Sequence, residues 1–252
     1  MRFKPLDLLL FSLLFIFAVS FPVDLFPIAL VYRLIIKISL RALLIGYFSY
    51  VLWKNRINIF KFANYRRGLL FIPFVLICFS NLFAALIAGM ALNPSVDGLH
   101  LFLIIVYYLL SVIIEELLFR LFIQGSLVFA SSIKRILVSA AIFALFHFIN
   151  VVDISSVDAF VSVLIQVVYA FGLGLLLAIV YEYTYSIPLC VCFHFMFNLF
   201  NKIFIEDIFH LSFAGYELVF YLTAVISGII VGVYAFLIYW FVLRRNERYF
   251  SE

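Results

Sequence analysis

The sequence SVIIEELLFR, residues 111–120, places two adjacent glutamates and an arginine inside an apolar run that extends from 100 to 123. That run is long enough to cross the hydrocarbon core of a bilayer as a helix, which takes about 20 residues. An ionised side chain at such a depth is costly, and these groups usually face a protein interior or a water-filled cavity. We therefore interpret Glu115, Glu116 and Arg120 as groups that point into a helical bundle.

The composition of the whole chain is that of a membrane protein. Of its 252 residues, 68% are hydrophobic and 12% are charged, whereas soluble domains are about half apolar and about one quarter charged. Apolar runs between polar or turn-forming breaks predict about eight spans, at 8–21, 31–53, 69–92, 100–123, 135–151, 159–183, 187–205 and 216–243. Because the runs are continuous rather than alternating, we predict an all-α, polytopic transmembrane helix bundle and no β-barrel.

Charged loops predict the orientation of this bundle, because short loops rich in Lys and Arg stay in the cytoplasm. Five such residues follow the second span: Lys54, Arg56, Lys61, Arg66 and Arg67. The alternate loops hold acidic residues, among them Asp24, Asp97 and Asp153. We therefore expect both termini to be cytoplasmic. The net charge of +4 reports this topology and gives no reason to expect nucleic acid as a partner.

The two adjacent glutamates have different expected roles. On a helix they are about 100° apart, so they cannot share one face. Arg120 lies four residues after Glu116, which is the spacing at which a carboxylate and a guanidinium meet on a helix. This pair would neutralise itself and leave Glu115 as the carboxylate without an assigned partner.

Two later spans supply partners for Glu115. His147 lies deep in the fifth span, and His194 and Asn198 lie at i and i+4 on one face of the seventh. At about 1.5 Å per residue their depths are similar to that of Glu115, so we expect one shared cavity in the cytoplasmic half of the bundle. These groups can activate water and receive a developing oxyanion. The alternative is that these polar side chains only form hydrogen bonds between helices, or that they line an ion pathway.

For other polar residues in the predicted spans, the sequence gives less reason to expect a role in catalysis. Arg33, Lys37 and Arg41 recur every four residues on one face of the second span, and we expect snorkelling and internal pairing there rather than contact with substrate. Gln166 and Tyr169 can line the cavity, but hydrogen bonding between helices is the expected role of each.

The polar segments resemble the three motifs of the CPBP family. Residues 115–120 match EExxxR, 143–147 match FxxxH, and 194–198 match HxxxN. That family includes the type II CAAX prenyl endopeptidases and the bacteriocin-processing or self-immunity Abi proteins. We accordingly divide the chain into N-terminal transmembrane helices (1–99), a CPBP/Abi-like catalytic core (100–202), and a C-terminal transmembrane helix with a basic tail (203–252).

The resemblance implies an intramembrane endopeptidase. In that reading Glu115, with His147, activates the attacking water, and His194 and Asn198 stabilise the tetrahedral oxyanion. The second glutamate and the arginine of the first motif hold the local geometry. The implied partners are a peptide or protein substrate, itself membrane-associated or not, and the lipid bilayer of a bacterial plasma membrane. A non-catalytic immunity or scaffold protein of the same fold is the alternative.

The residues of such a site allow two readings of its metal dependence. Two histidines and a glutamate suit a catalytic zinc ion with an open position for water. However, the chain has no HExxH, the candidate ligands lie on three separate spans, and an amide is a poor zinc ligand. Because a glutamate and a histidine can activate water alone, we favour a glutamic-type peptidase without metal or other cofactor over a metallopeptidase.

Overall fold

The computed structural model describes residues 3–60, 64–87, 91–92, 97–127, 131–153, 157–201, 203, 209–210 and 216–243. The basic tail and Lys61 lie outside these residues. The longer helices are α1 (Pro5–Ser20), α2 (Leu30–Lys54), α4 (Ile72–Ile87), α5 (Gly98–Glu116), α6 (Ser132–Phe146), α7 (Val157–Thr184), α8 (Ile187–Asn198) and α9 (Tyr216–Ile238). Short elements complete the list: α3 (Tyr65–Gly68), 3₁₀ turns at Val23–Leu25, Leu69–Phe71, Gln124–Ser126 and His147–Asp153, and π-helical segments at Leu117–Ile123 and Tyr239–Leu243.

These helices confirm the predicted all-α transmembrane bundle. Among the described residues, five helical segments are long and apolar enough to cross a membrane: Pro5–Leu25, Leu30–Lys54, Gly98–Ser126, Ser132–Asn150 and Phe160–Thr184. Two shorter apolar helices, Ile187–Asn201 and Val225–Phe241, accompany them. The β-structure among the described residues is a two-residue antiparallel ladder between β1 (Ala91–Leu92) and β2 (Phe209–His210).

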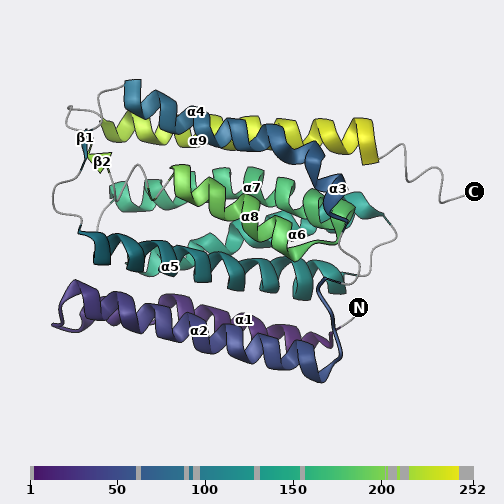
Figure 1. Ribbon diagram of the computed structural model, residues 1–252, viewed down its shortest axis with the longest axis horizontal. Coiled ribbons are helices and arrows are strands. Elements are labelled where there is room, and N and C mark those ends of the chain that lie inside the picture. The colour runs from purple at the N-terminus through teal and green to yellow at the C-terminus, as the bar shows by residue number, and fades with distance from the viewer. Residues whose placement is uncertain are drawn as a thin grey trace, which may run out of the picture.

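The helices form three layers (Figure 1). Helices α1 and α2 make one outer layer, α4 and α9 make the other, and α5 to α8 lie between them. Within the middle layer α7 packs against α6 and α8, while α5 packs against α8 and, outward, against α2. The layer that carries the polar motifs is therefore covered by other helices on two faces.

Local capping sets where α5 and α8 begin, and hence where their polar residues point. The Asp97 carboxylate caps α5 by accepting a hydrogen bond from the backbone N–H of His100 at 2.7 Å. Ser186 caps α8 in the same way by accepting from the N–H of Leu189 at 3.2 Å. The preceding residue, Tyr185, has a φ of 51°, which lets the chain reverse between α7 and α8 within two residues.

Helices α7 and α9 touch backbone to backbone at a pair of glycines. A Cβ atom added to Gly172 would lie 2.1 Å from the carbonyl oxygen of Gly228, and one added to Gly228 would lie 2.6 Å from the Cα of Tyr169. Neither position has room for a larger residue without a backbone shift. This contact fixes α9 against the central layer.

Candidate functional site

Glu116 is fully buried and accepts hydrogen bonds from two directions. Arg120 Nε donates to Glu116 Oε2 at 3.2 Å, so the structure contains the ion pair expected from their spacing. His194 on α8 lies with Nδ1 2.7 Å from Glu116 Oε1. Because an ionised carboxylate can only accept, His194 Nδ1 is the donor. Glu116 therefore orients an imidazole as well as neutralising an arginine.

Arg120 lies in the π-helical segment that continues α5, and its side chain is also fully buried. Its Nη1 donates to Ser139 Oγ on α6 at 2.7 Å and to Gln124 Oε1 at 3.5 Å. The arginine thus links the end of α5 to α6 by a hydrogen bond, one helical turn after Glu116. A π-helical turn inside an α-helix is rare and is frequently found at functional sites.

His194 connects the two adjacent glutamates. Its Nε2 lies 3.7 Å from Glu115 Oε2, on the opposite side of the ring from Glu116. The His194 side chain is 3% exposed, whereas that of Glu115 is 20% exposed. The buried glutamate therefore holds the imidazole, and the more accessible glutamate faces the cavity described below.

His147 is held by its own helical turn. Its Nδ1 lies 3.0 Å from the carbonyl oxygen of Phe143, and because a carbonyl only accepts, Nδ1 carries a proton. When the ring is neutral, Nε2 is therefore an acceptor. The Phe143 ring contacts both imidazoles edge to face, with centroids 5.0 Å from His147 and 5.6 Å from His194. The phenylalanine of the FxxxH motif therefore spaces the two histidines.

One cavity of ≈150 Å³ is bordered by Glu115, His147, His194 and Asn198 together. The four side chains come from α5, the turn after α6, and α8, and the sequence expected them at one site. A polar space of this size holds several water molecules. Gln166 and Tyr169 also line it, and Gln166 Oε1 accepts a hydrogen bond from Asn150 Nδ2 at 2.8 Å.

Arg41 lines the cavity, whereas the sequence grouped it with Arg33 and Lys37 and gave it no place at the site. It is 2% exposed and donates from Nε to Ser111 Oγ at 2.7 Å and from Nη2 to the Tyr107 hydroxyl at 3.1 Å. The expected internal pairing does occur, but all of its described acceptors are neutral. Ser111 lies one helical turn before Glu115, so the guanidinium is in the same wall as the candidate base. Only the fold reveals this, because Arg41 resembles its neighbours Arg33 and Lys37 in sequence.

The donor set does not fit a catalytic zinc ion held by three protein ligands. Among the described residues, no group of three or more His, Cys, Asp or Glu side chains is arranged to hold a metal. One nitrogen of His194 is already bonded to Glu116, and Nδ1 of His147 is bonded to a backbone carbonyl. Each ring thus donates from one nitrogen to an acceptor of the protein and keeps the other nitrogen available, as histidine ligands of metals also do. The misfit rests on the lack of a third ligand among the described residues, and we derive no step through a metal.

A chain of buried and partly buried polar groups leads from the site toward the far end of α7. Gln124 Nε2 donates to the carbonyl oxygen of Ala178 at 3.0 Å and to Glu182 Oε2 at 3.4 Å. Glu182 is also ion-paired with Arg135 of α6. Together with the Arg120–Gln124 contact, these bonds connect the Glu116 carboxylate to a second pocket lined by Gln124, Arg135 and Glu182.

The comparison with known families covers this part of the chain. Residues 97–200 match the family model described as Type II CAAX prenyl endopeptidase Rce1-like. The match begins at the cap of α5 and ends just beyond α8, so it contains all of the residues proposed above for the motifs. No curated protein is significantly similar to the chain.

Proposed function

We propose that this chain is a glutamic-type intramembrane endopeptidase, because residues 97–200 match the family model described as Type II CAAX prenyl endopeptidase Rce1-like. The observation that carries the proposal is the shared cavity, with Glu115 3.7 Å from His194. Its substrate is a peptide or a protein segment that enters the cavity in an extended form.

In the proposed reaction a water molecule in the cavity gives a proton to Glu115 as its oxygen attacks the scissile carbonyl carbon. His147 Nε2, an acceptor in the neutral ring, orients this water. The tetrahedral intermediate carries its negative charge on the former carbonyl oxygen. As it collapses, the carbon–nitrogen bond breaks and the proton held by Glu115 passes to the leaving amine, which restores the carboxylate.

Asn198 and His194 are proposed to receive the oxyanion. Asn198 lines the cavity, and its amide hydrogens can donate to a developing negative charge. His194 can do so through Nε2 only as the imidazolium, because Nδ1 already donates to Glu116. The two adjacent glutamates therefore have separate proposed tasks: Glu115 moves a proton, and Glu116 positions the imidazole.

The test compares the peptide termini in membranes of cells that carry the wild type or Glu115→Gln. New termini that appear only with the wild type identify substrates, which the purified protein should then cleave in detergent. Glu115→Gln should be made in normal amount and be inactive.

The same cells test the alternative of an immunity or scaffold protein. A cellular phenotype that persists in both Glu115→Gln and His194→Ala, with no difference in termini, would reject the peptidase and favour the scaffold. Loss of the phenotype in both variants at normal abundance supports cleavage, because neither variant can perform the proposed chemistry.

A further inference from the structure

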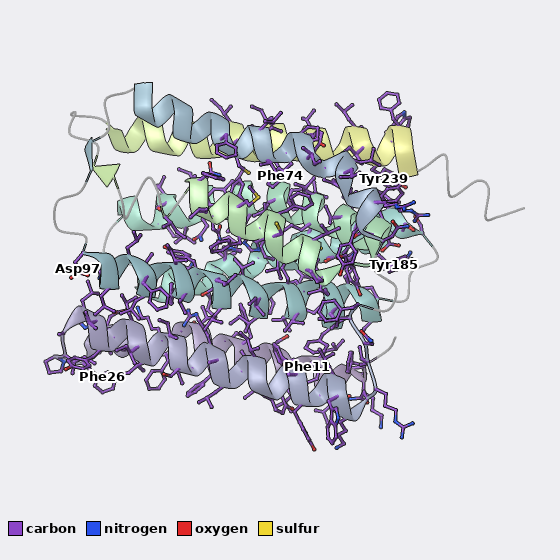
Figure 2. All side chains as sticks on the ribbon, in the orientation of Figure 1. Phe11, Phe26, Phe74, Asp97, Tyr185 and Tyr239 are labelled. Atoms are coloured by element: carbon purple, nitrogen blue, oxygen red, sulfur yellow. The ribbon has the colours of Figure 1, made fainter. Side chains whose placement is uncertain are left out.

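Arg41 lies near the middle of its membrane-spanning helix, as the twelfth of the 25 residues of α2. Figure 2 shows Phe26 and Asp97, which precede α2 and α5, at the same end of the bundle, so the two helices run in the same direction. At about 1.5 Å per residue, Arg41 lies roughly 16 Å along α2 and Ser111 roughly 20 Å along α5. The guanidinium therefore meets Ser111 close to the middle of the bilayer, where an ionised group is most costly.

The described ion pairs leave this buried cation without a carboxylate in contact. Arg120, whose side chain is also fully buried, is paired with Glu116 at 3.2 Å. Among the described residues, no carboxylate lies within 4.0 Å of Arg41, and Glu115 attracts it only from a longer distance. An anion that reached the guanidinium would form a charge-assisted contact that the described side chains leave unmade.

Two hydrogen-bond donors at this position lack a described acceptor. A guanidinium has five N–H groups, and four bonds use them, to Ser111 Oγ, to the backbone carbonyls of Ala18 and Lys37, and to the Tyr107 hydroxyl. One hydrogen of Nη2 remains, and the described residues offer no acceptor to the Tyr107 hydroxyl hydrogen either. Nη2 lies 3.1 Å from the Tyr107 oxygen, and both residues line the catalytic cavity. The two donors can therefore serve the two oxygens of one carboxylate.

We propose that Arg41 and Tyr107 bind a carboxylate of the substrate, in the same cavity wall as Glu115. The substrate class is then a peptide that carries a carboxylate close to the cleaved bond, either on an aspartate or glutamate side chain or at its own C-terminus. This specificity rests on the proposed peptidase function. The binding of a carboxylate does not, because it requires only the cavity.

The affinities of three short peptides test this assignment. N-acetyl-alanyl-alanine carries a C-terminal carboxylate, its C-terminal amide is uncharged, and N-acetyl-aspartyl-alanine amide carries its carboxylate on a side chain. Each is titrated into the wild-type protein in detergent at constant ionic strength, and its Kd is obtained from the shift of the unfolding temperature. At least one carboxylate peptide should bind roughly 10- to 100-fold more tightly than the uncharged amide, as expected for hydrogen bonds between charged groups. The peptide that binds more tightly identifies the source of the carboxylate.

Three variants connect this preference to the two proposed residues. Arg41→Gln should abolish the preference for a carboxylate, and Tyr107→Phe, which removes only the hydroxyl, should reduce it. The matched control is Arg33→Gln, which changes an arginine on the same face of α2 that lies 4.0 Å from Asp24 and does not line the cavity. This control should retain the full preference, because it leaves the proposed carboxylate site intact.

Equal Kd values for the carboxylate peptides and the amide in the wild type would overturn the proposal, and so would a failure of all three peptides to bind. A preference that survives in Arg41→Gln would overturn it as well. The first two outcomes use the wild type alone, so the proposal can fail even where Arg41→Gln does not fold. A carboxylate preference in a protein without peptidase activity would instead refute the proposed function and leave the carboxylate site in place.

Discussion

Replacing Glu116 with glutamine should destabilise the bundle far more than the same change at its neighbour. Glutamine keeps the size of the side chain but removes the charge that neutralises Arg120, whose side chain has no exposed surface. The remaining described partners of that guanidinium, Ser139 and Gln124, are neutral. Removing one partner of a buried ion pair costs about 3–5 kcal/mol, which is roughly a 10²- to 10⁴-fold shift in the unfolding equilibrium.

The assay is denaturant-induced unfolding in detergent micelles, with Glu115→Gln as the matched control. Glu115 is partly exposed to the cavity, so we expect its substitution to cost no more than about 1 kcal/mol. The double variant Glu116→Gln/Arg120→Met should recover part of the loss, because it also removes the stranded cation. Equal losses for the two single glutamine variants would refute the division of labour between the glutamates.

Three further predictions concern the oxyanion group, the helix contact and the cofactor. Asn198→Ala should lose roughly 10²- to 10³-fold in kcat with unchanged folding, and a fully active variant would remove Asn198 from the oxyanion pocket. Gly172→Ala should lower the free energy of unfolding by about 1–3 kcal/mol, because the added Cβ overpacks against Gly228. The control Gly46→Ala has nothing within 4 Å of its added Cβ and should be neutral or stabilising by up to about 1 kcal/mol. Similar unfolding midpoints for the two variants would contradict the α7–α9 contact. Peptide cleavage should survive prolonged chelation, and activity that is lost and then restored by stoichiometric zinc would reject the metal-free mechanism.

The approximate positions of the helices and the Glu116–Arg120 ion pair could be predicted from local features of the sequence. Each predicted span contains a helix, and five of these helices are long and apolar enough to cross a membrane, because about 20 apolar residues bounded by turns have few other stable arrangements in lipid. The pairing of Glu116 with Arg120 depends on a four-residue spacing within one helix, and that spacing is visible in the sequence. Domain limits and catalytic roles remain predictions.

The contacts that complete the site depend on tertiary packing and could not be predicted from spacing. His194 meets Glu116 across 78 positions of the chain, and the sequence assigned that glutamate to the arginine alone. The π-helical segment has no sequence signature of its own, yet it brings Arg120 within reach of Ser139. Arg41 and Lys37 share a helical face, but only the packing of α2 on α5 buries one and leaves the other beside Asp24.

The chain of polar side chains from Arg120 through Gln124 and Glu182 to Arg135 has a consequence for the membrane itself. A cavity that can hold water, joined by polar side chains to a pocket at the other end, is a potential leak for protons and small cations. Two arginines occupy this path, and each is paired with a carboxylate. Breaking the fully buried Arg120–Glu116 pair is costly, and a proton or cation that moved along the path would have to disrupt it. The ion pair that shapes the site therefore also opposes such a leak.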